Sequence, residues 1–189
     1  MVREETIKQC LERGRDGRGI IIINQNAKLS EMHYKKALRN IEVMNYLKKG
    51  NYEEWTVITA YYSMYQACLS ILTRIGLQSK DHTCTVAIIE KYFVRTGKLD
   101  KKSMDHYKNL SDVLEKIEKV KIEQKLLDAL KDIRDRRENI QYDVETRVSV
   151  NVENVIKNSI EFVENAKILV DNLDTKFIEA VRKDLERLA

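Results

Sequence analysis

A cluster of polar side chains around residue 137 is the part of the sequence best suited to chemistry on a phosphate group. Arg134, Arg137 and Gln141 are spaced by three and four residues, so a helix would place them on one face. Two guanidinium groups and the nearby Tyr142 would form a compact phosphate-binding surface. The alternative is a solvated face with ion pairs to the acidic neighbours Asp132, Asp135 and Glu138, and the spacing alone favours it.

A second candidate is an aromatic segment that is apolar on nearly every side. It contains Trp55, Tyr61, Tyr62 and Tyr65. Aromatic rings can stack on the bases of a single-stranded nucleic acid. A helix that is apolar all round is usually buried, however, so the segment is better interpreted as core. The tyrosine hydroxyls would then reach partners at the edge of the bundle.

His82 follows Lys80 and Asp81 directly before a predicted helix. A histidine at a helix start can donate to a phosphate or transfer a proton, because histidine titrates near neutral pH. It can equally be an ordinary loop residue. His33, His82 and His106 share no metal-ligand spacing, so we expect no metal site and no cofactor.

The three cysteines form no CxxC motif and are odd in number. We therefore expect free thiols in a reducing compartment. Cys68 lies in the most apolar segment and is interpreted as a small buried hydrophobe.

The composition predicts one all-α domain. The chain has 189 residues, no proline, six glycines and 43% apolar residues, which favours long helices around a sizeable core. The net charge of +4 permits an anionic partner without requiring one, because 34 basic residues nearly balance 30 acidic ones. The polar start does not resemble a signal peptide, and the run 20–23 is too short to span a bilayer. We expect a cytoplasmic protein with no membrane contact.

Residues 1–27 are predicted to be an N-terminal extension, with a short helix over 3–13, a flexible basic glycine-containing loop and a strand-like isoleucine run. Residues 28–189 are predicted to form the bundle, and its last helix, about 174–188, is equally compatible with an appendage or a dimer arm. Several residues are expected to begin helices: Ser30 as an N-cap, Asn51 in a capping box with Glu54, and Asp81, Asp100 and Asn151 at later starts.

Two stretches of the sequence together resemble proteins of the HEPN family. Glu54-Trp55-Thr56-Val57, the run 60–67, Gly76 and Lys80-Asp81-His82 are similar to the second-helix signature of that family. Arg137-Glu138-Asn139-Ile140-Gln141-Tyr142 is similar to its late arginine motif. The resemblance covers roughly residues 28–170, and the motifs occur in the family's order and separation.

The resemblance implies an antiparallel up-and-down bundle of about five to seven helices. HEPN proteins commonly form homodimers that place their arginine motifs in a shared cleft. Nuclease members cleave RNA without a metal, using an arginine and a histidine a few residues later. Many other members act beside a minimal nucleotidyltransferase in toxin–antitoxin-like pairs, and the transferase can modify a tyrosine of its HEPN partner.

This sequence departs from the nuclease pattern. The fifth residue after Arg137 is Tyr142 and the fifth after Arg134 is Asn139, so neither position holds histidine. Tyrosine is a poor general base at neutral pH and asparagine cannot act as one. Loss of the base typically costs a factor on the order of 10²–10⁴ in rate, so the residues argue against an enzyme.

We therefore expect a module that binds nucleotide, RNA or a nucleotidyltransferase. Its candidate phosphate contacts are Arg134, Arg137, Gln141 and His82. Arg137 and Tyr142 are candidates for a catalytic role, and His82 could replace the missing histidine if the fold brings it to the arginine face. One alternative is a metal-independent ribonuclease toxin with a degenerate motif. The other is a purely structural helical homodimer.

Overall fold

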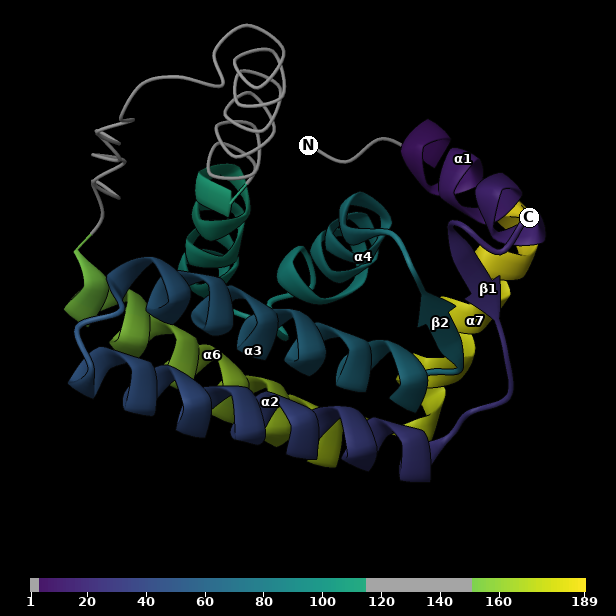
Figure 1. Ribbon diagram of the computed structural model, residues 1–189. Helices are drawn as coiled ribbons and strands as arrows, with labels where there is room; N and C mark the ends of the chain where they lie inside the picture. Colours follow the sequence, from purple (N-terminus) through teal and green to yellow (C-terminus); the bar gives the residue numbers. More distant parts are fainter. Residues whose placement is uncertain (1–3, 115–150) are drawn as a thin grey trace, which may run out of the picture.

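Three long helices form the body of the bundle, as Figure 1 shows for the computed structural model, which describes residues 4–114 and 151–189. Helices α2 (Ala27–Lys49) and α3 (Glu53–Arg74) are antiparallel neighbours, and α6 (Val152–Asp171) packs on both. The side-chain nitrogen of Lys48, near the end of α2, lies 2.8 Å from a carboxylate oxygen of Glu153, at the start of α6. The predicted all-α helical bundle is therefore confirmed.

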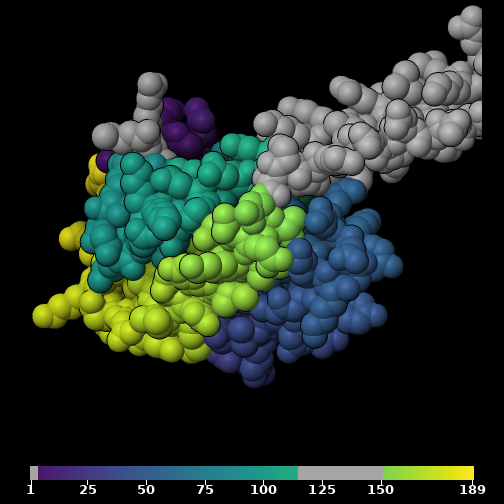
Figure 2. Space-filling model, turned by 90° about the vertical axis from the view of Figure 1, so that its left-hand side faces the viewer, coloured from purple at the N-terminus to yellow at the C-terminus, as the bar shows by residue number. Residues whose placement is uncertain are grey.

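Shorter elements complete the bundle. They are α1 (Glu4–Arg15), α4 (His82–Ile89), the π-helix η1 (Glu90–Val94), a helix whose described part covers 101–114, and α7 (Thr175–Leu188). In Figure 2 the start of α6, in light green, lies between the teal segment that precedes residue 115 and the blue α2–α3 region. Within residues 4–114 and 151–189, no helix is both long enough and apolar enough to cross a membrane.

One small antiparallel sheet interrupts the helices. Strand β1 (Ile20–Ile22) pairs with β2 (Leu77–Ser79), and Ile21 lies opposite Gln78. The strand-like isoleucine run is thus confirmed. Its partner strand was not predicted, because three residues directly after a helix carry too little pattern to indicate a strand.

Helix α3 is buried along most of its length, as its apolar composition predicted. Its side chains Val57, Met64, Ile71 and Leu72 are fully buried. They belong to one core together with residues from the other helices: Met44, Phe93, Tyr107 and Phe162. This core fixes the α3 tyrosines and the start of α4 relative to each other.

Three of the expected helix starts are confirmed by their side chains. The carboxylate of Asp81 accepts a hydrogen bond from the Cys84 amide at 2.9 Å, and Asn151 caps α6 in the same way. Asp100 accepts from the amide of Ser103 at 2.8 Å at the start of the helix over 101–114.

The expectations for Ser30 and for the Asn51–Glu54 capping box are wrong. Helix α2 begins earlier, with Asn26 as its N-cap, and Ser30 is buried inside it, where its hydroxyl donates to the Ser70 carbonyl oxygen at 2.8 Å. Asn51 has a φ of 60° and makes the turn between α2 and α3, so Tyr52 is the N-cap residue and makes no capping side-chain bond. A tight helix–helix turn overrides the local capping pattern here.

Both ends of the described chain pack onto the bundle. Helix α7 buries Ile178, Val181, Leu185 and Leu188, and α1 lies against α7 (Figure 1). The guanidinium of Arg15 donates to the carbonyl oxygen of Ala189 at 2.7 Å. The end of α1 therefore lies next to the end of the described chain, and the two contacting residues are 174 positions apart in the sequence.

Candidate functional site

The late arginine motif lies outside the residues that the structure describes. Arg134, Arg137, Gln141 and Tyr142 all fall in the range 115–150. The structure therefore places the other group of candidates, which are His82 and the aromatic residues of α3.

His82 lies in the first turn of α4 and faces two tyrosines of α3. Its imidazole ring stacks on the Tyr65 ring, with centroids 4.0 Å apart and planes 17° apart. The Tyr61 hydroxyl forms a short hydrogen bond with Nδ1 of His82, and these two rings are 5.5 Å apart. Residues that lie 17 and 21 positions apart in the sequence thus meet because β2 and the turn before α4 fold back along α3.

Tyr107, in the helix over 101–114, extends this cluster into the core of the bundle. Its hydroxyl donates to the Tyr61 hydroxyl oxygen at 3.3 Å, and the two rings stack with centroids 5.3 Å apart. Tyr107 is fully buried, with Phe162 on its other side at 6.0 Å between ring centroids. The sequence placed Tyr107 only in an apolar stripe, and no motif indicated that it would contact the site.

The four aromatic residues singled out from the sequence separate into two groups. Tyr61 and Tyr65 are buried, at 4% and 8% exposure, so the core interpretation holds for them. Trp55 and Tyr62 are 54% and 40% exposed, so it does not hold for these two. The amphipathic signal was weak because polar side chains such as Thr56 and Ser63 occupy buried positions of α3.

Burial keeps the three phenols of the cluster protonated at neutral pH. Desolvation raises the pKa of Tyr61, of Tyr65 and, most of all, of Tyr107. Because Tyr107 donates its proton to Tyr61, the Tyr61 proton is available for Nδ1 of His82. A neutral His82 held in this way carries its own proton on Nε2.

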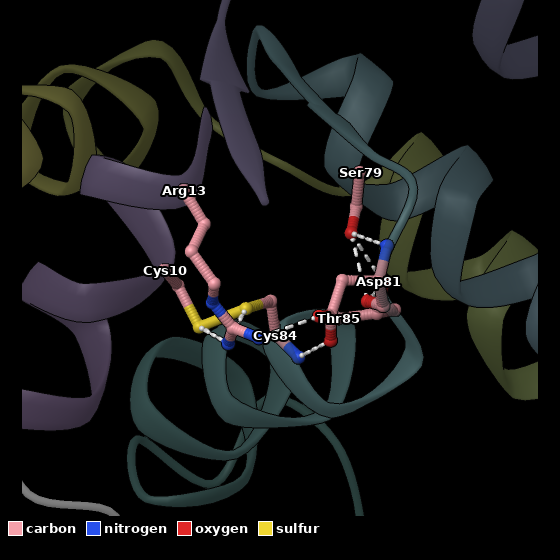
Figure 3. The surroundings of a disulfide bond; sticks show 6 residues. All are labelled: Cys10, Arg13, Ser79, Asp81, Cys84 and Thr85. Carbon is pink, nitrogen blue, oxygen red and sulfur yellow. Dashed lines mark hydrogen bonds and ion pairs between the residues drawn. A yellow bond between two sulfur atoms is a disulfide. The ribbon is translucent and has the colours of Figure 1, made fainter. Parts of the chain in front are cut away.

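The turn before α4 is fixed by a set of polar contacts next to His82. Asp81, besides capping α4, forms an ion pair with Arg13 of α1, with Nη1 2.9 Å from Oδ2. The Thr85 hydroxyl lies 2.8 Å from the Ser79 hydroxyl and 2.9 Å from the Asp81 carbonyl oxygen. Figure 3 shows these side chains converging on the turn. The turn that precedes His82 is therefore held by contacts from α1 and from α4.

Cys10 and Cys84 form a disulfide, so the expectation of free thiols is wrong for these two residues. They are 74 positions apart, and only the packing of α1 against α4 brings their Cα atoms to 5.6 Å. No sequence spacing could indicate this pairing. Cys68 is a free, buried thiol as predicted, and burial raises its pKa above the ordinary range.

The other two histidines are bonded elsewhere in the bundle. Nδ1 of His33 lies 2.8 Å from Oε1 of Gln66, and Nδ1 of His106 lies 3.2 Å from the Asn158 amide nitrogen. Across 4–114 and 151–189, no group of three or more histidine, cysteine or acidic residues is arranged to hold a metal ion.

Known families, curated proteins and solved structures were compared with the chain, and none of them matches it. The resemblance to HEPN proteins therefore rests on the two sequence motifs. The first motif supplies His82 and its tyrosine partners, while the second lies in 115–150.

The tyrosine cluster can orient the imidazole of His82 and share a proton with it. The hydroxyls of Tyr107 and Tyr61 lead to Nδ1, and the Tyr65 ring supports one face of the imidazole.

Proposed function

We propose that the protein is a HEPN-type helical module that binds the phosphates of RNA or of a nucleotide, as one half of a pair with a minimal nucleotidyltransferase. The observation that supports this best is the contact of His82 with Tyr61 and Tyr65. It joins the two separate stretches of the first family-like motif, the α3 helix and the Lys80-Asp81-His82 turn, in one cluster.

In this proposal the charge for phosphate binding comes from the arginine face. Arg134 and Arg137 would donate to phosphate oxygens in the bidentate manner of guanidinium groups, and Gln141 would add an amide donor. The proposal requires no covalent chemistry by this chain, in keeping with the absence of histidine from both motif positions.

A metal-independent ribonuclease is the second candidate, and one observation favours it. His82 is a histidine hydrogen-bonded to a buried phenol, which is a suitable arrangement for a general base or acid. If His82 reached the arginine face, its Nε2–H could protonate the leaving oxygen as a general acid while Arg137 held the scissile phosphate. Tyr142 would then contact the substrate without acting as the base.

Incubation of end-labelled single-stranded RNA with purified protein separates these functions. The variants are wild type, Arg137→Ala, and Arg39→Ala as a matched control, since Arg39 is an exposed arginine that forms an ion pair with Glu42 on α2. We expect wild type and Arg39→Ala to shift intact RNA on a native gel, and Arg137→Ala to lose the shift. RNA cleavage by wild type but not by Arg137→Ala would replace the binding module with the ribonuclease. A homodimer that neither shifts nor cleaves RNA and binds neither a nucleotide nor a nucleotidyltransferase would contradict both and support the structural alternative.

A further inference from the structure

The disulfide between Cys10 and Cys84 links α1 to α4, the helix that carries His82. Cys10 lies on α1 and Cys84 in the first turn of α4, two residues after His82. Both cysteines are fully buried, and the side chain of Arg13, which is 48% exposed, contacts both sulfur atoms (Figure 3).

The two sulfur atoms have different electrostatic surroundings. Nη2 of Arg13 lies 2.9 Å from Sγ of Cys84 but 3.5 Å from Sγ of Cys10. Cys84 also lies in the first turn of α4, where the helix dipole favours negative charge. The Asp81 carboxylate shares the same guanidinium, with Oδ2 2.9 Å from Nη1, so the difference between the two sulfurs rests on the shorter distance from Nη2 to Cys84. A negative charge on sulfur is therefore stabilised at Cys84 more than at Cys10.

From this asymmetry we propose that Cys10–Cys84 is a thiol–disulfide exchange site for an external thiol or dithiol. The incoming thiolate bonds to Sγ of Cys10, the S–S bond breaks, and its electron pair leaves on Sγ of Cys84. Exchange favours the leaving sulfur whose thiolate is better stabilised, which here is Cys84. In the reverse direction the Cys84 thiolate attacks the mixed disulfide on Cys10 and expels the external thiolate.

A dithiol completes the reduction with balanced atoms and electrons. Its second thiolate attacks the sulfur that is bonded to Cys10, releases the Cys10 thiol and leaves the dithiol as a cyclic disulfide. Two electrons pass from the dithiol to the protein, and its two protons end on solvent or on the released cysteines. Reduction then exchanges the covalent link between α1 and α4 for an ion pair of Arg13 with the Cys84 thiolate.

Access to the buried sulfurs requires only a local opening of α1. This helix buries Ile7, Cys10, Leu11 and Gly14, and exposed contacts such as Glu4 with Arg187 at 3.2 Å add to these. The strands that attach it to the body are three residues long. Elements with few buried contacts open well below the free energy of global unfolding.

The first test uses oxidised wild-type protein and glutathione, a monothiol, under native conditions. After the reaction is quenched with acid, the position of the mixed disulfide is mapped by peptide mass spectrometry. We expect glutathione on Cys10 and a free thiol on Cys84. An adduct on Cys84 would overturn the assignment of roles, and a disulfide that reacts only in denaturant would overturn the exchange site itself.

The second test measures alkylation of the dithiol-reduced protein at pH 6.5 with iodoacetamide. We expect Cys84 to react about three to four times faster than Cys10, because a tenfold larger thiolate fraction is partly offset by lower nucleophilicity. Arg13→Gln should remove most of this difference, while Arg15→Gln should keep it, since Arg15 donates to the Ala189 carbonyl oxygen at the other end of the described chain. Equal rates in wild type, or a difference untouched by Arg13→Gln, would contradict the proposed role of Arg13. Circular dichroism spectra of both variants check that they are folded.

Discussion

The imidazole ring of His82 lies on the Tyr65 ring at 4.0 Å between centroids, while its Nδ1 is bonded to the hydroxyl of Tyr61. Two tyrosines one helical turn apart on α3 thus fix both the plane and the rotation of one imidazole. The position of His82 in the bundle is defined by these rings, by the Asp81 cap and by the disulfide at Cys84.

Substitution of Tyr61 by phenylalanine should destabilise the fold. The change removes the hydroxyl that links Tyr107 to His82 and leaves the buried Tyr107 hydroxyl without its acceptor. We expect the free energy of unfolding to fall by about 1–2 kcal/mol. Urea denaturation followed by circular dichroism measures it, with Tyr46→Phe as the control, since Tyr46 is 75% exposed. Equal losses in the two variants would show that the hydroxyl chain adds no stability.

The contacts of Asp184 predict a stability difference that depends on pH. Burial alone would raise the pKa of Asp184, but hydrogen bonds from Lys91, Arg187 and Tyr92 outweigh it and lower the pKa to about 2. The carboxylate thus stabilises the fold fully above its unfolded pKa of about 3.9, and this contribution is lost as the pH falls toward about 2.

Asp184→Asn should therefore lower the free energy of unfolding at pH 7, by an amount on the order of 1–2 kcal/mol after allowing for partial exposure. The difference from wild type should shrink between pH 4 and the lowest pH at which both proteins stay folded. Asp171→Asn is the control, because Asp171 forms an exposed pair with Lys167 on one helix. Urea denaturation at pH 7 and at about pH 3 tests this. A difference that is the same at both pH values would mean that charge is not its cause.

Removal of the disulfide should cost more stability than either of these changes. The Cys10→Ser, Cys84→Ser double variant loses a link that closes a loop of 74 residues. Such links typically stabilise by about 2–4 kcal/mol. Urea denaturation of the variant and of oxidised wild type should show this difference, and wild type with excess dithiol should resemble the variant. A variant as stable as the oxidised protein would contradict the prediction.

Tyr142 is predicted to accept a nucleotidyl group from a transferase partner. This prediction rests on the position of Tyr142, which lies near the basic residues of the late arginine motif and belongs to the stretch that resembles the HEPN motif. After incubation with ATP and a minimal nucleotidyltransferase encoded beside this protein, peptide mass spectrometry should show a nucleotide mass on Tyr142. Tyr46→Phe should be modified like wild type, whereas Tyr142→Phe should stay unmodified. An unmodified Tyr142 peptide alongside an active transferase would count against this pairing.

Much of the fold could be predicted because its signals are local. Asp81, Asp100 and Asn151 mark helix starts by their own side chains, and the apolar character of α3 indicates its central position. The N-cap prediction for Ser30 was wrong because the N-cap of α2 is Asn26. The capping-box prediction for Asn51 was wrong because a tight turn precedes α3.

The site was harder to predict because it depends on contacts between distant residues. The pairing of Cys10 with Cys84 and the bond from Tyr107 to Tyr61 join residues 74 and 46 positions apart. Each requires the packed bundle before the residues meet, and neither leaves a spacing in the sequence. His82 and the α3 tyrosines could be chosen as candidates by residue type, but their mutual contact could not be predicted.

The central claim, phosphate binding through the arginine face, is tested most directly by the salt dependence of RNA affinity. Fluorescence anisotropy with a labelled single-stranded RNA gives the dissociation constant at several salt concentrations for wild type, Arg137→Ala and Arg39→Ala. Each phosphate contact to a single strand contributes about 0.7 to the slope of log affinity against log salt. We predict that Arg137→Ala weakens binding and reduces this slope by about that amount, while Arg39→Ala changes neither. Wild-type affinity and slope retained by Arg137→Ala would contradict the account.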